Sequence, residues 1–208
     1  MGFQVVDHPL IKHKLGLLRR KDTSISHFRQ LTQEITIMLT YEATRDLILE
    51  PRSVMTWQGK AQAERISGKK ISVVPILRAG LGMLDGVLAL IPSARVNVVG
   101  LYRNEETLYP VEYYKKFNND IQIRDALIID PMLATGHSMA RVCEMLTEEG
   151  CSNIKALCMV AAPEGVQYMD EHFPDVTIYA AALDDHLNED GYIIPGLGDA
   201  GDRIFGTK

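Results

Sequence analysis

Asp130 could do chemistry because of the residues that surround it in the sequence. The run Ala126–Ile129 before it is wholly apolar, which is typical of a strand buried on both faces. Pro131 follows, and proline has no N–H group with which to continue a ladder. We therefore expect Asp130 at the carboxyl end of a strand, where open α/β sheets bind their ligands.

The residues after Asp130 form a small-residue loop that leads into a predicted helix over Ser138–Glu149. A loop that ends at a helix N-terminus offers several backbone N–H groups to a phosphate. The alternative is an ordinary connection in which Thr135 or Ser138 caps the helix. The predicted phosphate loop consists of Pro131, Met132, Leu133, Ala134, Thr135, Gly136, His137 and Ser138.

A second strand–loop–helix pattern places Arg78 in a similar position. A predicted strand over Ile71–Leu77 ends at Arg78, and a predicted helix over Met83–Leu90 follows a loop with two glycines. A lone arginine there is usually half of a surface ion pair. Glycines let a ligand approach the backbone, and a guanidinium binds a phosphate through two parallel hydrogen bonds. The combination favours an anion site at Arg78.

Two later segments have less regular patterns. After a predicted strand over Ala94–Leu101, Thr107–Tyr114 alternates loosely, which suits an exposed hairpin or a mobile flap. By its neighbours alone, Arg103 is a solvated charge. The tail from Gly191 to Gly201 holds four glycines and a proline, so we expect no helix there and many free backbone groups. Such a backbone is either a turn-rich tail or a binding surface for a small planar ring such as a pyrimidine.

Taken together, these motifs resemble a known family. The run Asp130–Gly136, Asp-Pro-Met-Leu-Ala-Thr-Gly, is similar to the loop by which type I phosphoribosyltransferases hold the 5′-phosphate of phosphoribosyl pyrophosphate (PRPP). Ile76–Gly82 and Gly191–Arg203 resemble segments of the uracil phosphoribosyltransferase family. Four separated segments match in family order between Arg78 and Asp202. The resemblance implies pyrimidine salvage, in which uracil and PRPP give UMP and pyrophosphate.

The same resemblance implies a role for individual residues. Arg78, Arg103 and Asp199 would bind PRPP together with Asp130 and the phosphate loop. Asp130, Arg103 and Asp199 would be the catalytic residues, and the uracil site would consist of Ile193, Gly198, Asp199 and Ala200. Mg²⁺ would be the cofactor, resting largely on pyrophosphate oxygens and water because Ile129 precedes a single acid. The family also implies a homo-oligomer, dimer or tetramer, and in some members GTP is an activator.

His137 departs from the family pattern, which has a glycine at this position. If the residue needs a positive φ, a side chain costs on the order of 1–2 kcal/mol. If φ is negative, the exchange is nearly free. Asp185-His186 replaces a Glu-Gly pair, in a position less tied to the chemistry.

The elements that must position these residues alternate between strand and helix. This pattern predicts an α/β fold with a mostly parallel sheet flanked by helices, which is the type I phosphoribosyltransferase fold. N-terminal helices, a flexible hairpin and a C-terminal hood would be added to it. We expect one domain over 1–208, with a helical N-terminal extension over 1–50 and a base-binding hood over 183–203. Further strands are expected at Ile154–Ala162 and Val176–Ala182, with a helix over Glu164–His172 between them.

Composition narrows the function further. A net charge of -5 argues against nucleic acid as a partner, and hence against a PRPP-binding regulator of pyrimidine metabolism that acts on RNA. A transferase for another nucleobase is the nearer alternative. No apolar run approaches the roughly 20 residues that span a bilayer, so we expect no membrane partner. Three cysteines without a Cys-x-x-Cys pair, and a start unlike a signal peptide, favour a cytoplasmic protein with reduced thiols.

Overall fold

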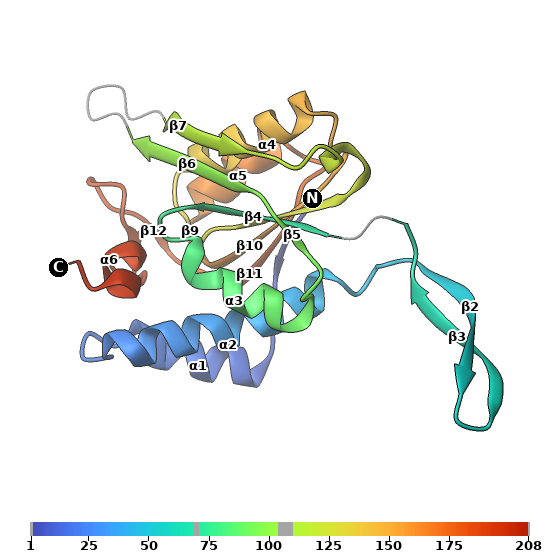
Figure 1. Cartoon of the computed structure of the whole chain (residues 1–208). Helices are drawn as coiled ribbons and strands as arrows, with labels where there is room; N and C mark the ends of the chain where they lie inside the picture. The colour runs from blue at the N-terminus through green and yellow to red at the C-terminus, as the bar shows by residue number, and fades with distance from the viewer. Residues whose placement is uncertain (1, 69–70, 104–109, 208) are drawn as a thin grey trace.

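A sheet of mostly parallel strands runs through the centre of the molecule, with helices against both of its faces (Figure 1). The computed structural model describes residues 2–68, 71–103 and 110–207. Among the described strands of this sheet, β7 alone runs antiparallel to its neighbour, β6. The short strands β5 (Arg95–Val96) and β9 (Met132–Leu133) pair with β4 and β10. The strand order is β1 (Phe3–Val5), β11 (Thr177–Leu183), β10 (Asn153–Ala161), β8 (Asp125–Ile129), β4 (Ser72–Leu77), β6 (Val98–Arg103) and β7 (Pro110–Lys116).

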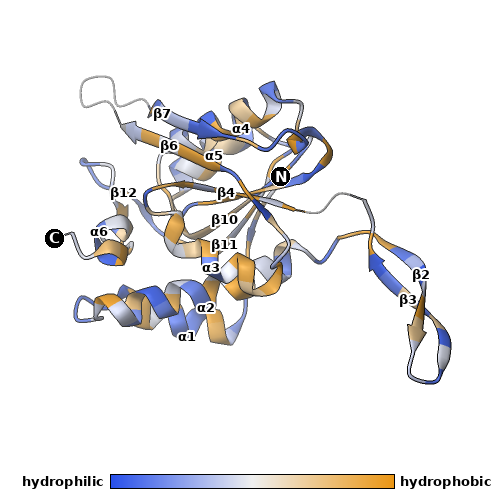
Figure 2. Ribbon diagram, viewed as in Figure 1, coloured by the Kyte–Doolittle hydropathy of each residue, from blue (hydrophilic) through white to orange (hydrophobic). Residues whose placement is uncertain are grey.

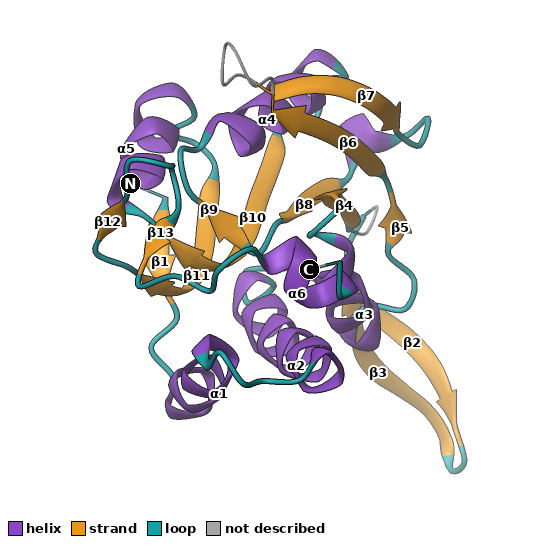
Figure 3. Ribbon diagram, turned by 90° about the vertical axis from the view of Figure 1, so that its left-hand side faces the viewer, coloured by secondary structure: helices purple, strands orange, loops and turns teal. Residues whose placement is uncertain are grey.

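The central strands are mostly apolar because both faces of the sheet are covered. Alternate residues of β8 point to opposite faces. Ala126 and Ile128 belong to a core shared with α4 (His137–Glu148) and α5 (Pro163–His172). Leu127 and Ile129 belong to a second core shared with α1 (Pro9–Arg19), α2 (Ile25–Ala43) and α3 (Leu81–Leu90). Figure 3 shows the two groups of helices on either side of the sheet, and Figure 2 shows how hydrophobic the strands between them are.

The predicted α/β fold with a mostly parallel, helix-flanked sheet is therefore confirmed. One detail of β8 differs. Pro131 interrupts the ladder without ending it, because its carbonyl accepts a hydrogen bond from Met159 N at 2.9 Å. Pairing with β10 then resumes in β9, where Met132 lies opposite Val160. The start of the phosphate loop is thus fixed to the sheet.

Two features of the first third of the chain are not predicted by the sequence pattern. Within the expected helical extension, β1 adds a parallel edge strand beside β11. Beyond α2, β2 (Leu49–Thr56) and β3 (Gly59–Ile66) form an antiparallel hairpin that extends away from the sheet and its helices (Figure 1). Nearly every hairpin residue is exposed to some degree, so neither face imposes the alternation that marks a half-buried strand.

The C-terminal segment contains β12 (His186–Leu187), β13 (Ile193–Ile194) and a short helix, α6 (Ala200–Phe205). The expectation of no helix up to Gly201 is wrong at its end, because Gly201 lies inside α6. The Asp199 carboxylate accepts a hydrogen bond from Asp202 N at 2.8 Å and so caps the helix. An N-cap of this kind can start a helix despite a following glycine.

All three cysteine thiols are free and buried. Burial raises the pKa of the Cys143 thiol to about 12, and it also raises the pKa of Cys151 and Cys158. These thiols therefore behave as small apolar groups of the core. Among the helices of the described residues, none combines the length and apolar character that a membrane crossing requires.

Candidate active site

The connections of β4 and β8 place Arg78 and Asp130 at the same edge of the sheet. These two strands are neighbours and run parallel, with Val74 opposite Ile128. After β4 the chain continues to β6 on one side, and after β8 it continues to β10 on the other. The sheet order therefore reverses between β4 and β8. Ligands of open α/β sheets bind at such a point, outside the carboxyl ends of the strands.

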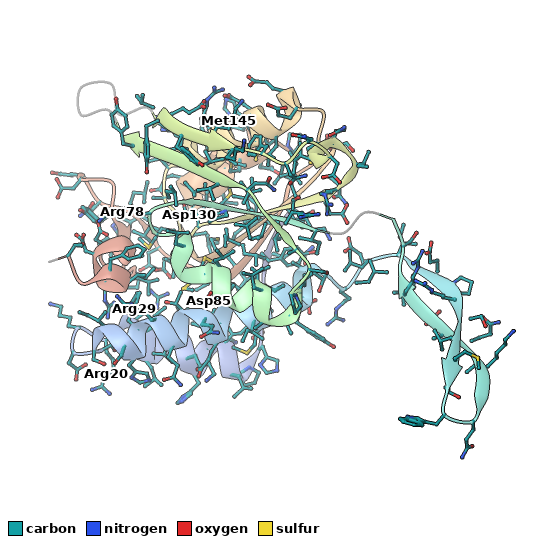
Figure 4. All side chains as sticks on the ribbon, in the orientation of Figure 1. Arg20, Arg29, Arg78, Asp85, Asp130 and Met145 are labelled. Carbon is teal, nitrogen blue, oxygen red and sulfur yellow. The ribbon has the colours of Figure 1, made fainter. Side chains whose placement is uncertain are left out.

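Asp130 directly follows β8 and is only partly exposed. Its N–H donates to the Leu157 carbonyl at 3.2 Å, which ties the residue to β10. One carboxylate oxygen accepts a weak hydrogen bond from Met132 N at 3.4 Å. Loss of hydration raises the pKa of Asp130 from its ordinary 3.8 to about 7. Perturbed carboxyl groups of this kind are concentrated at functional sites. Figure 4 labels Asp130 and Arg78, which follow the neighbouring strands β8 and β4.

A cavity of about 310 Å³ joins Asp130 to the C-terminal hood. Asp130 and Met132 line it from the phosphate loop, and Ala79 lines it from the loop after β4. The opposite wall comes from residues 190–192 and 198–201. Two segments that the sequence predicts as phosphate site and base site thus share one cavity.

The phosphate loop ends at the N-terminus of α4 without a side-chain cap. Gly136 is the N-cap residue, and neither Thr135 nor Ser138 takes that role. In the described part of the chain, the N–H groups of Ala134, Thr135 and Gly136 donate to no protein oxygen. The first N–H groups of a helix likewise lack partners within the helix. The expectation that Thr135 or Ser138 caps the helix is therefore wrong. The free donors of the loop suit an anion, and phosphate binding stays a prediction.

The backbone at His137 is helical, so this residue does not need a positive φ. Gly136 has a φ of +83°, whereas His137 is the first residue of α4. The left-handed conformation thus falls on a glycine, and the side chain at His137 does not carry that strain. The imidazole ring lies edge-on to the Tyr168 ring of α5, with ring centroids 4.7 Å apart.

Arg78 extends from the end of β4 toward the hood. Its guanidinium lies 3.4 Å from the Asp202 carboxylate and 5.9 Å from the centre of the Phe205 ring. The peptide bond between Leu77 and Arg78 is cis. The Arg78 side chain is 58% exposed, and ion pairs so exposed are weak. Arg78 therefore forms the surface ion pair of the simpler interpretation, and anion binding stays a prediction.

Other predicted residues divide into two groups. Gly198, Asp199 and Ala200 line the cavity, but Ile193 does not. The side chain of Ile193 is buried in the core, and its backbone lies opposite Leu187 in the β12–β13 pair. Arg103 ends β6, and its side chain, like residues 107–109 of the expected flap, lies outside the described residues. Contact of Ile193 or Arg103 with a ligand stays a prediction.

Gly165, in the first turn of α5, is a residue of this site that no sequence motif predicts. A Cβ atom there would overlap the carbonyl oxygen of Ala134 and would lie 3.0 Å from the carbonyl carbon. The backbone of α5 therefore approaches the phosphate loop more closely than a side chain allows. Gly165 lies 31 positions beyond Ala134 in the sequence, so no local pattern indicates this contact.

Comparisons with known proteins agree with this geometry. A solved protein from Aquifex aeolicus, AQ2163, is 40% identical over 99% of both chains, with a TM-score of 0.95. A hypoxanthine-guanine phosphoribosyltransferase from Bacillus anthracis covers 78% of this chain and 81% of its own, at 16% identity and a TM-score of 0.53. A hypoxanthine phosphoribosyltransferase from Trypanosoma cruzi, solved with the product IMP, covers 76% of each chain, at 11% identity and a TM-score of 0.52.

The last two similarities concern the fold alone, which is that of the type I phosphoribosyltransferases. A sequence model described as uracil phosphoribosyltransferase matches residues 5–207, nearly the whole chain. The enzyme class that follows is a pentosyltransferase that uses PRPP and a base. This chain therefore belongs to the uracil phosphoribosyltransferase family.

Proposed function

We propose that this protein transfers the ribosyl-5-phosphate group of PRPP to a ring nitrogen of uracil, giving UMP and pyrophosphate. The observation that carries the proposal is the single cavity lined by both Asp130 and residues 190–192 and 198–201. This cavity would bring an anchored sugar phosphate and a planar base into contact. In this proposal the whole chain acts as one domain, with residues 183–203 as the base-binding hood.

Each part of the cavity has a chemical role. The free N–H groups of Ala134, Thr135 and Gly136 hold the 5′-phosphate at the N-terminus of α4. Asp130 binds the ribose hydroxyls, and its negative charge favours the positive charge that develops on the sugar ring. Arg78 and Arg103 neutralise the departing pyrophosphate. Backbone groups of Ile193, Gly198 and Ala200 orient uracil, and Asp199 lies between the base and PRPP.

Mg²⁺ fits the donors of this cavity. Three acidic residues, Asp130, Asp190 and Asp199, are among those that line it, and Mg²⁺ prefers oxygen ligands. Within the described residues, no three acidic, histidine or cysteine side chains converge as a metal site. We propose that Mg²⁺ takes most of its ligands from pyrophosphate oxygens and water. When bound, it would offset charge on the leaving pyrophosphate.

An assay with four bases tests the substrate. The purified protein is given PRPP and Mg²⁺ with uracil, hypoxanthine, adenine or orotate, each with and without GTP. We expect UMP from uracil, and faster turnover with GTP if the protein shares the activation of some family members. Another nucleotide without UMP would show a transferase for a different base. PRPP binding without any nucleotide product would instead indicate a regulator.

The raised pKa of Asp130 gives the expected pH dependence. If the carboxylate is the working form, its fraction increases as pH rises through about 7. The kcat/KM for PRPP should therefore rise up to about tenfold per pH unit below 7 and level off above it. The effect on stability has the opposite direction. Between pH 3.8 and 7 the folded protein binds the extra proton, so the free energy of unfolding should fall as pH rises. A rate profile that is flat between pH 5 and 8 would contradict an essential Asp130 carboxylate.

We also propose that the protein is a homo-oligomer that uses the β2–β3 hairpin as a contact. An isolated two-stranded hairpin is at best marginally stable in water. Its tip exposes Met55 and Trp57, and Ile48 and Leu49 are exposed at its base. Large apolar side chains left exposed at both ends of a projecting hairpin favour a contact with another chain.

Light scattering after size-exclusion chromatography tests the hairpin contact. We expect the mass of a dimer or tetramer for the native chain. Replacing both Met55 and Trp57 by serine should lower that mass, while Tyr41→Ser, at another exposed aromatic side chain, should not. An unchanged mass in the hairpin variant would remove the hairpin from the interface.

We further propose that the protein is cytoplasmic, which the buried free thiols support.

A further inference from the structure

A buried carboxylate lies at the base of the hood. Asp184 directly follows β11, and its side chain is 3% exposed. Its N–H donates to the Ala161 carbonyl at 2.8 Å, which fixes the residue to the end of β10. The two carboxylate oxygens accept hydrogen bonds from Arg19, at 2.8 Å from Nη1 and 2.5 Å from Nη2. A carboxylate buried in this way needs such charged partners.

Arg19 and Asp184 together hold both backbone groups of Gly196. The Gly196 N–H donates to Asp184 Oδ2 at 2.9 Å, and the Gly196 carbonyl accepts from Arg19 Nη1 at 2.8 Å. Gly196 has a φ of +60°, so the chain turns sharply at this point. Two residues later it reaches Gly198 and Asp199, which line the cavity. The position of the hood wall is therefore coupled to the position of Gly196.

Two other arginines hold the chain on the far side of this turn. Arg203 Nη1 donates to the Leu197 carbonyl at 2.8 Å, and its guanidinium lies 4.3 Å from the centre of the Phe28 ring. Arg29 of α2 donates to the Ile204 carbonyl in α6 at 2.6 Å (Figure 4). These contacts fix the segment after Gly196. Among the three arginines, only Arg19 is paired with a buried carboxylate that binds the hood itself.

We propose that Arg19 is a positioning residue for the base. Arg19 is the last residue of α1, outside the sheet and the phosphate loop. Through Asp184 and Gly196, it sets where the backbone of residues 198–200 meets the base. Its hydrogen bonds go to Asp184 and Gly196, and none goes to the phosphate loop. A change at Arg19 therefore acts first on the base, and it reaches PRPP only through Asp199. This inference rests on the proposed function, because it takes residues 198–200 as the base site.

Kinetics of Arg19→Lys and Arg19→Gln test the role of Arg19. Lysine keeps the charge but loses the two-pronged geometry of the guanidinium. We expect the KM for the base to rise about tenfold, which is the value of one lost hydrogen bond to a charged group. The KM for PRPP and kcat depend on Asp130 and the phosphate loop as well as on Asp199, so they should change less, by no more than about threefold. The matched control is Arg20→Lys, the next residue, whose exposed guanidinium pairs with Asp22 at the surface.

Hydrogen–deuterium exchange provides a readout that needs no substrate. In the Arg19 variants, the peptide that contains Gly196 should exchange faster, while the β8 peptide keeps its native rate. Either of two results would overturn the proposal. One is a base KM within twofold of the native value in a folded variant. The other is a joint loss of kcat and of both substrates' affinity, with faster exchange throughout, which indicates a purely structural role.

Failure of the proposed function is distinguishable from failure of this inference. If the native protein transfers another base, the same KM comparison is made with that base. If it transfers none, the proposed function is wrong, and native exchange rates at Gly196 in Arg19→Gln would then overturn the coupling as well.

Discussion

Replacing Asp130 by asparagine should lower kcat by roughly 10²–10³-fold, which corresponds to the loss of about 2.7–4 kcal/mol of transition-state stabilisation. The negative charge lies at the switch point of the sheet, in a partly desolvated position where water screens it little. Asparagine keeps the shape and still accepts the hydrogen bond from Met132 N. What it removes is the charge that would face the developing positive charge on the ribose. Steady-state kinetics at about pH 8, where the native carboxyl is mostly ionised, measure the loss.

Asp125→Asn is the matched control, because Asp125 is the first residue of the same strand, at the opposite end of β8 from the cavity. Its carboxylate accepts a hydrogen bond from the Asn153 side chain at 2.7 Å. We expect its kcat to be within about twofold of the native value. A native kcat in Asp130→Asn would show that the charge is not needed. A loss confined to the KM for PRPP would assign Asp130 to binding alone.

The strands that precede Arg78 and Asp130 could be predicted, because a strand buried on both faces has a continuous apolar sequence. A run such as Val73–Leu77 or Ala126–Ile129 is apolar without alternation. The β2–β3 hairpin has no such apolar pattern, since neither of its faces is covered within the chain. The edge strand β1 has only three residues, too few for a pattern to be recognised.

The site was predictable where its chemistry is local in sequence. The phosphate loop is one continuous segment, and its glycine with positive φ stands inside it. Contacts between distant segments are different. Arg19 meets Asp184 across 165 positions, and no spacing rule connects two such residues. Their pairing appears only when α1 has packed beside the end of β11. Prediction from motifs therefore finds the residues expected to bind a ligand before it finds the residues that hold them in place.

The second large effect is expected from Gly165→Ala. Alanine is the better helix former, so by propensity alone the exchange should stabilise α5 by about 0.5–1 kcal/mol. The new Cβ would instead overlap the Ala134 carbonyl oxygen and lie 3.1 Å from the Leu133 carbonyl oxygen. Relieving this overlap must move either α5 or the phosphate loop. Overpacking of this kind costs typically 1–3 kcal/mol. We expect PRPP to bind at least tenfold more weakly, measured by calorimetry or fluorescence, because the loop loses the alignment of its N–H groups.

Gly16→Ala is the matched control for this exchange. Gly16 lies in α1, and a Cβ atom there would meet nothing within 4 Å. The same substitution therefore leaves only the gain in helix propensity, and the unfolding midpoint should rise slightly while PRPP affinity stays native. If Gly165→Ala lowers stability but leaves PRPP affinity unchanged, α5 moves and the loop does not. The close contact would then serve packing alone. If stability and PRPP affinity both fall, the backbone of α5 holds the phosphate loop in its binding conformation. Glycine is then required at position 165 because of the ligand site and not because of the helix that contains it.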